Sequence, residues 1–156
     1  FTERLQGLQF PVERVELRSF SEQYLEEYAD IDIALDTSPY TGGLTTCEAL
    51  YMGVPVVTLR GRTHGSRFGA SILTAAGLPE LIAENEMEYV KIAVALAHRP
   101  EQLALNRQRM RSHLEISRLM DAKGYMKGVE GIYRSLWHAF CAKGDRWAMK
   151  KSSKKQ

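Results

Sequence analysis

Residues Ile31–Leu59, IDIALDTSPYTGGLTTCEALYMGVPVVTL, decide the fold class. The compact apolar run Ile31–Leu35 predicts a strand, which ends at the Asp-Thr-Ser-Pro sequence that follows it. A helix is expected from Thr45 to about Met52, where Gly53 stops it. Val54–Leu59 is a continuous apolar and β-branched run, which is typical of a strand buried on both faces of a parallel sheet. The stretch therefore predicts one β-α-β unit.

The alternation of strands and helices continues on both sides of this unit. Upstream, Val12–Leu17 alternates apolar and charged residues and predicts a short strand, and Ser21–Tyr28 predicts a helix capped by Ser21. Downstream, Ser66–Ala76 predicts a helix closed by Gly77, and Leu81–Ala83 predicts an edge strand. This order implies an α/β fold, a doubly wound parallel sheet with right-handed crossovers.

Additional C-terminal helices are expected after the last strand. Glu86–Ala97 is amphipathic, a second helix begins near Pro100, and Val129–Phe140 carries one apolar, largely aromatic stripe. That stripe has two interpretations: it covers the sheet, which is the commoner use, or it packs on something outside the domain. We expect one domain over residues 1–141, with these helices at about 86–141, and a basic, flexible tail over residues 142–156.

Composition and charge exclude several classes of protein. The 156 residues include 21 Lys and Arg against 19 Asp and Glu, a net charge of +2 without the basic stripe of a nucleic-acid-binding protein. The longest apolar runs are too short to span a membrane. Two distant cysteines, Cys47 and Cys141, and the absence of a signal-peptide pattern favour a cytoplasmic location. The chain begins at Phe1 without an initiator Met, so we expect a piece of a longer protein.

The loop Asp36–Thr46 is the candidate ligand site, because ligands bind at the carboxyl ends of strands in open parallel sheets. Gly42 and Gly43 let the backbone approach a ligand closely. The free N–H groups and the dipole of the following helix favour an anion, to which threonine hydroxyls add hydrogen bonds. Thr45 and Glu48 form a capping-box pattern. Glu48 therefore has two candidate roles: bonding back to Thr45, which the pattern favours, or accepting a hydrogen bond from a ribose hydroxyl.

Other polar residues carry weaker signals. His64 follows the buried strand and has two candidate roles, contact with donor or acceptor, or the commoner exposed loop histidine. Arg67 either neutralises phosphate or pairs with an acid, and the sequence favours neither. Cys47 lies in the first turn of a helix, whose dipole lowers a thiol pKa, but we interpret it as a packing residue. The remaining histidines have no second ligand at i+4, so no metal site is expected: His98, His113 and His138.

Two strings resemble one family. Asp36–Gly43, DTSPYTGG, and Thr45–Thr58, TTCEALYMGVPVVT, are similar to the carboxyl-terminal catalytic half of the O-linked N-acetylglucosamine transferase family, most closely its SPINDLY branch. The likeness continues through Ser66–Ser71, SRFGAS, and covers the chain from about Val12 to Phe140. The resemblance implies the second Rossmann-like half of an inverting, metal-independent GT-B glycosyltransferase without a cofactor. Such enzymes pass a sugar from UDP-N-acetylglucosamine or GDP-fucose to Ser or Thr of a protein acceptor.

The resemblance also implies roles for single residues. Gly42, Gly43, Leu44, Thr45 and Thr46 would clamp the diphosphate, and Glu48 would bind the ribose, which reverses the preference for capping. Ser19, Phe20 and Tyr24 would border the base. No catalytic residue is assigned, since the family's general base belongs to the missing first half, and helical TPR repeats before it select the acceptor.

Departures from the family pattern leave alternatives open. The glycosaminyl branch has His at Gly43 and at Tyr24, Thr at Leu44 and Lys at Ser21, which weakens the case for UDP as the base. The replacements at Gly43 and Leu44 motivate a rival function, a non-catalytic binding module that docks a partner. A second rival is another GT-B enzyme, such as a sugar-nucleotide epimerase, against which the Thr45–Thr58 string argues.

Overall fold

The computed structural model describes the backbone of residues 2–152 and the side chains of residues 3–143. Three strands, β1 (Ala34–Asp36), β2 (Val56–Leu59) and β3 (Ile82–Ala83), form a parallel sheet in the order β1-β2-β3. Helix α2 (Leu44–Tyr51) follows β1, α3 (Phe68–Ala76) follows β2, and α4 (Glu86–Ala97) follows β3. The expected α/β class is therefore confirmed, with β3 at an edge of the sheet as predicted.

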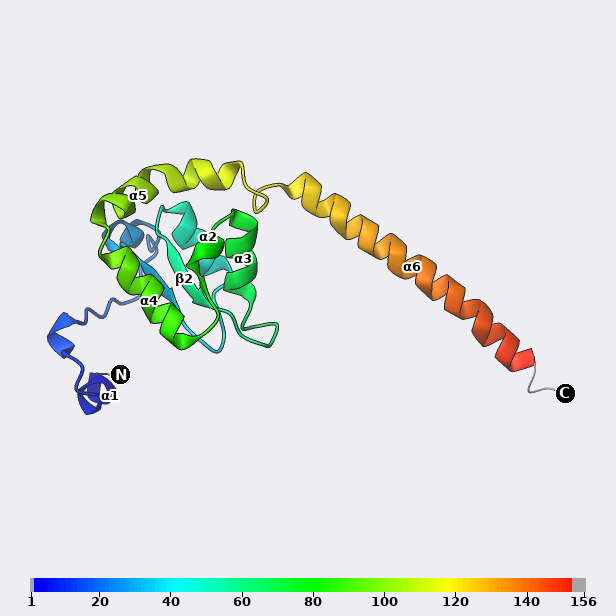
Figure 1. Ribbon diagram of the computed structural model, residues 1–156, viewed down its shortest axis with the longest axis horizontal. Coiled ribbons are helices and arrows are strands. Elements are labelled where there is room, and N and C mark those ends of the chain that lie inside the picture. The colour runs from blue at the N-terminus through cyan, green and yellow to red at the C-terminus, as the bar shows by residue number, and fades with distance from the viewer. Residues whose placement is uncertain (1, 153–156) are drawn as a thin grey trace.

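Helices cover both faces of this sheet. Two successive right-handed crossovers in one direction place α2 and α3 on the same face. Helix α4 packs against β2 and β3 from the other face, and α5 (Pro100–Glu115) contacts both α2 and α4 (Figure 1). Because the strands are parallel, their carboxyl ends meet at one edge, with Asp36 paired in register with Thr58.

The hydrophobic core lies between the sheet and its helices. Val54 and Leu50 are fully buried, as expected for the run before β2 and the inner face of α2. Met110 and Leu114 of α5 join the same cluster, so α5 belongs to the domain. Two glycines end helices by adopting left-handed backbone, Gly53 at φ 85° and Gly77 at φ 77°, as the sequence predicted. A Cβ at Gly53 would lie 2.8 Å from backbone atoms of Arg107 in α5.

The segment before the sheet differs from the sequence prediction. A short helix, α1 (Thr2–Gly7), opens it. The predicted strand at Val12–Leu17 is wrong: a 3-10 helix, η1 (Val12–Arg14), is followed by extended backbone that pairs with no strand among residues 2–152. Leu17 is 65% exposed, so this apolar side chain of the alternating segment does not pack on the sheet.

The predicted helix Ser21–Tyr28 is also wrong. Turns lead into a 3-10 helix, η2 (Glu26–Asp30). The Ser21 hydroxyl accepts a hydrogen bond from the Gln23 N–H at 3.1 Å, a local turn that competes with α-helix. A third 3-10 helix, η3 (Pro79–Leu81), precedes β3.

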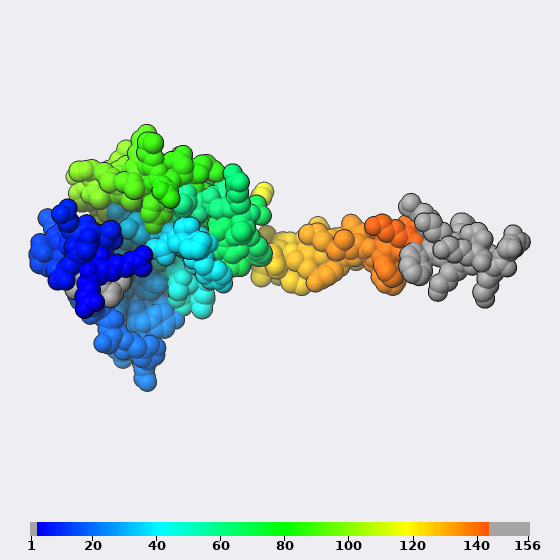
Figure 2. All heavy atoms as spheres, turned by 90° about the horizontal axis from the view of Figure 1, so that it is seen from below, coloured from blue at the N-terminus to red at the C-terminus, as the bar shows by residue number. Residues whose placement is uncertain are grey.

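Helix α6 (Ala122–Ser152) projects from the domain as a single rod (Figure 2). Its predicted stripe is exposed: Ile132, Tyr133, Leu136, Trp137 and Phe140 are 60–70% accessible. The interpretation that this stripe covers the sheet is therefore wrong, because α6 leaves the domain instead of folding back. The predicted tail is helical to Ser152, and residues 153–156 lie outside the described part. No described helix has the length and apolar character that crossing a membrane requires.

Candidate functional site

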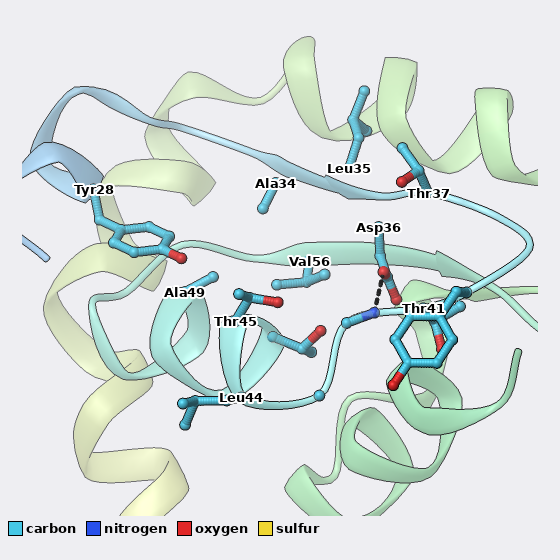
Figure 3. A pocket seen from close by; sticks show the side chains of 14 residues that line it. Tyr28, Ala34, Leu35, Asp36, Thr37, Thr41, Leu44, Thr45, Ala49 and Val56 are labelled. Carbon is cyan, nitrogen blue, oxygen red and sulfur yellow. Dashed lines mark hydrogen bonds between the residues drawn. The ribbon is translucent and has the colours of Figure 1, made fainter. Parts of the chain in front are cut away.

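A pocket of about 510 Å³ opens at the carboxyl end of β1. Its wall is formed by β1, the β1–α2 loop and the first turn of α2, with Tyr28 at one end and Thr41 at the other (Figure 3). The five residues predicted for the diphosphate clamp line this pocket together: Gly42, Gly43, Leu44, Thr45 and Thr46. The structure thus brings the clamp residues to one cavity.

Asp36, at the end of β1, holds the β1–α2 loop in place. Its Oδ1 accepts the Gly42 N–H at 2.6 Å, drawn in Figure 3, and its Oδ2 accepts the Thr58 hydroxyl at 2.7 Å. The Tyr89 hydroxyl donates to the Asp36 carbonyl oxygen at 3.2 Å, and burial raises the pKa of that phenol. The sequence prediction missed this role of Asp36, although an acid directly after the apolar run Ile31–Leu35 was the available signal.

Thr41 joins the β1–α2 loop to the β2–α3 loop. It is fully buried, and its N–H and hydroxyl both donate to the Gly65 carbonyl oxygen at 3.1 Å. Its hydroxyl oxygen also accepts the Gly69 N–H at 3.2 Å. These bonds tie the pocket wall to the first turn of α3, so the two loops form one packed unit.

The two glycines of the loop have different surroundings. A Cβ at Gly42 would lie 2.6 Å from the Thr46 Oγ1 and 2.7 Å from the Thr45 Oγ1, so the backbone and both hydroxyls are in close contact there. A Cβ at Gly43 would have no atom within 4 Å. Gly42 is therefore required by close contact with the chain's own threonine hydroxyls, whereas Gly43 faces open space. The approach of this backbone to a ligand stays a prediction.

Helix α2 begins one residue earlier than predicted. Gly43 is the N-cap, no side chain caps the helix, and Thr45 lies inside the first turn. The predicted capping box is therefore wrong. The N–H groups of the first turn have no carbonyl partner within a helix, and the helix dipole adds partial positive charge there. Because the residues that carry these donors and the Thr45 hydroxyl line the pocket, the arrangement suits an anion such as a diphosphate.

Glu48 contacts Tyr24 instead of capping α2. Its Oε1 accepts the Tyr24 hydroxyl at 2.7 Å, and this bond raises the pKa of the Tyr24 phenol. Burial, and then the Glu48 charge, raise the pKa of Tyr28, which lines the pocket. The structure therefore brings together the two residues predicted for the ribose and the base, although neither of them lines the cavity.

The remaining candidates lie away from this pocket. Ser19 and Phe20 do not line it, and Phe20 is 91% exposed. His64 and Arg67 line a second pocket, where the His64 ring packs edge-on against Phe68 with centroids 4.8 Å apart. Both side chains are exposed.

Cys47 is half-buried and does not line the described pocket. Burial, and then Glu48, raise the pKa of the half-buried Cys47, opposite to the effect expected from the helix dipole. This agrees with a packing role for that residue. No group of three or more His, Cys, Asp or Glu side chains suited to a metal occurs among the described residues.

Comparisons with known proteins place this geometry in context. The model of glycosyl transferase family 41 matches residues 21–129. A probable UDP-N-acetylglucosamine--peptide N-acetylglucosaminyltransferase SPINDLY of Eustoma exaltatum subsp. russellianum is 42% identical over 134 residues, which are 86% of this chain and 14% of the relative. The protein of the same name in Arabidopsis thaliana is 39% identical over 144 residues, covering 90% of this chain and 16% of the relative.

Two further proteins from other organisms show the same similarity. The UDP-N-acetylglucosamine--peptide N-acetylglucosaminyltransferase of Caenorhabditis elegans is 35% identical over 109 residues, 70% of this chain and 10% of the relative. A mutant O-GlcNAc transferase from Thermobaculum terrenum superposes with a TM-score of 0.79 and 38% identity, over 92% of this chain and 28% of that structure. The chain thus spans only a small part of the length of the proteins it matches.

Proposed function

This chain belongs to glycosyl transferase family 41, and we propose that it is the nucleotide-sugar-binding domain of a protein O-glycosyltransferase. The enzyme would transfer N-acetylglucosamine or fucose from UDP-N-acetylglucosamine or GDP-fucose to Ser or Thr of a protein acceptor. The observation that carries the proposal is the first turn of α2, whose residues, with free N–H groups and the Thr45 hydroxyl, line a pocket at the carboxyl edge of the sheet.

The proposed chemical task of this domain is to stabilise the leaving group. Negative charge builds on the nucleoside diphosphate as the bond between sugar and oxygen breaks. Backbone N–H groups and a helix dipole, held in place before reaction, stabilise that charge without a metal ion. The hydrogen bonds that the buried Asp36 carboxylate accepts from Gly42 and Thr58 keep the β1–α2 loop rigid.

The nucleoside would lie at the other end of the same pocket. Glu48 has a carboxylate available for the ribose hydroxyls, with Tyr24 and the pocket residue Tyr28 beside it for the base. Ser19 and Phe20 would reach the base only if their exposed segment moves toward the pocket. The departures at Gly43, Leu44 and Tyr24 leave uracil and guanine as the two donor bases to compare.

The proposed enzyme also requires parts outside this chain. The general base would come from a first catalytic half, and helical repeats would select the acceptor, in a cytoplasmic protein. The exposed stripe of α6 supports this division, since Leu136, Trp137 and Phe140 lack a cover within the domain. Packing of that stripe on the first half would close the cleft around the donor.

The test is calorimetric titration of the chain with UDP and with GDP. Replacing Thr45 and Thr46 together by Val removes two hydroxyls at nearly constant volume, and we expect the dissociation constant to rise by at least tenfold, about 1.4 kcal/mol. Thr74→Val is the matched control, because its hydroxyl donates to the Ala70 carbonyl on α3, outside the pocket. An unchanged affinity in the double variant would contradict the clamp.

Two outcomes would favour the rivals. Failure to bind either nucleotide, even when the chain is joined to a first catalytic half, supports a non-catalytic docking module. Conversion of the donor sugar into its epimer, without a protein acceptor, supports a sugar-nucleotide epimerase.

A further inference from the structure

A second groove runs along the outer face of α3. It has a volume of about 760 Å³ and lies between the β2–α3 loop and the linker from α5 to α6. Its polar lining consists of Arg60, His64, Arg67, Ser71, Thr74 and Arg118. No acidic side chain lines it. The groove is therefore a basic surface on a chain whose net charge is only +2.

The arginines of this groove differ in whether an acidic side chain neutralises their positive charge. Arg60 pairs with Glu84 at 3.0 Å. Arg67 and Arg118 take part in no ion pair and no side-chain hydrogen bond within the part of the chain that is described. Two guanidinium groups are therefore available for an anionic ligand, and guanidinium binds carboxylates through paired hydrogen bonds.

The spacing of the two arginines sets the length of the ligand. Arg67 precedes the first residue of α3, and Arg118 lies beside its last turn, where the Leu119 N–H donates to the Ala75 carbonyl at 3.2 Å. Eight residues of helix separate these positions, a rise of about 12 Å. An extended peptide covers that distance in about four residues, whereas a single phosphate group reaches one end only.

The groove adjoins the donor pocket through two aromatic rings. Tyr40 lines the donor pocket, Phe68 lines the groove, and their rings pack edge-to-face with centroids 5.9 Å apart. The bonds from Thr41 to Gly65 hold the same two loops together. A ligand at the Arg67 end of the groove would thus be separated from a donor in the first pocket only by the Tyr40 and Phe68 rings.

We propose that this groove binds an extended acidic segment of the protein acceptor, an inference that rests on the proposed transferase function. Carboxylates about four residues apart contact Arg67 and Arg118, and the exposed Ser71, which lines the groove between them, is available to the peptide backbone. The apolar part of the lining, Phe68, Ala70 and Ala75, favours a peptide over a nucleic acid, which requires a continuous basic stripe.

The experiment measures binding of fluorescent peptides to the full 156-residue chain by anisotropy. The probe is an extended Ser-containing peptide with two Glu residues about four positions apart, and its control carries Gln at both positions. We expect the Gln peptide to bind at least tenfold more weakly. Arg67→Gln and Arg118→Gln should each raise the dissociation constant of the Glu peptide by about three- to tenfold.

A matched charge control is available on α5. Arg109→Gln removes one exposed arginine outside both pockets and should leave peptide binding within about twofold. Circular dichroism of each variant checks that the domain is folded. Because Arg67 and Arg118 are exposed, their replacement by Gln should leave folding intact.

Four results would overturn the inference. The first is that the Glu and Gln peptides bind equally well, and the second is that neither groove variant changes peptide binding. The third is that inorganic phosphate or a single-stranded oligonucleotide binds more tightly than the Glu peptide. The fourth is that Arg67→Gln weakens nucleotide binding and peptide binding equally. The last would assign the groove to the donor site. Titration with UDP and GDP, of the chain alone and joined to a first catalytic half, separates the two proposals, because failure of both refutes the donor pocket and leaves the peptide result standing.

Discussion

Replacement of Gly42 by Ala is the sharpest perturbation of the donor pocket. The added Cβ would lie 2.6 Å from the Thr46 Oγ1 and 2.7 Å from the Thr45 Oγ1, against an ordinary contact of 3.4–4 Å. One side must therefore move by almost 1 Å, either the two hydroxyls or the loop. Overpacking of this kind costs about 1–3 kcal/mol. Movement of the loop also breaks the 2.6 Å bond from the Gly42 N–H to Asp36, and an unpaired buried acceptor costs a similar amount.

Both routes lower nucleotide affinity. In the proposed donor site, displaced hydroxyls would lose their contacts with the diphosphate, and a displaced loop would turn the N–H groups of α2 away from it. We expect the Gly42→Ala variant to lose about 1–3 kcal/mol of unfolding free energy and to bind UDP or GDP at least tenfold more weakly. Urea unfolding and calorimetric titration measure the two quantities on the same preparation.

Gly43→Ala is the matched control in the same loop. No atom lies within 4 Å of the Cβ that it adds, and its backbone has φ −105°, outside the left-handed region. We expect a change in unfolding free energy within about 1 kcal/mol and nucleotide affinity within about threefold. Equal damage from both variants, or unaltered nucleotide affinity in Gly42→Ala, would refute the reasoning from close contact.

Three further predictions follow from single residues. Asp36→Asn replaces one of two buried acceptor oxygens by a donor and should cost about 1–3 kcal/mol in urea unfolding; a cost under about 0.5 kcal/mol would contradict its role as the pin of the loop. Because the hydrogen bond to Glu48 raises the folded pKa of Tyr24, that bond stabilises the fold fully below the ordinary phenol pKa and is lost as pH rises through the folded value. An ultraviolet titration of tyrosinate should therefore lose one high-pKa phenol in Tyr24→Phe, whereas loss of a phenol with an ordinary pKa would contradict the bond. Leu73→Ala, at a fully buried position, should cost about 2–5 kcal/mol, whereas Trp137→Ala, 62% exposed on α6, should stay within about 0.5 kcal/mol; similar losses would show that α6 packs on the domain.

Local patterns predicted the central elements well. The run Val54–Leu59 contains β2, and the helix after the Gly-Gly loop begins one residue earlier than expected. Helix α4 matches the predicted range Glu86–Ala97, and the glycines at 53 and 77 end their helices by left-handed backbone. These features depend on neighbours a few residues away, through periodicity, burial and backbone freedom, and such information is present in any short window of sequence.

The same local patterns failed where a distant partner decides the outcome. Val12–Leu17 alternates like a strand but finds no neighbouring strand, and a strand without a partner leaves its backbone groups to water. The capping box failed because Asp36 holds the loop so that Gly43 caps α2, and Glu48 then turns to Tyr24. None of these partners lies within one helical turn of the other.

The sequence by itself determined the α/β class, the parallel sheet, the glycines that end two helices and the loop residues that line one pocket. Only the tertiary structure decided that Asp36 and Thr41 hold this pocket to the neighbouring loop, that Tyr24 and Glu48 meet, and that α6 stands away from the domain. The physical reason is the range of the interactions. Periodicity and turn preference act between near neighbours, whereas hydrogen bonds between residues 22–28 positions apart exist only once the sheet has formed.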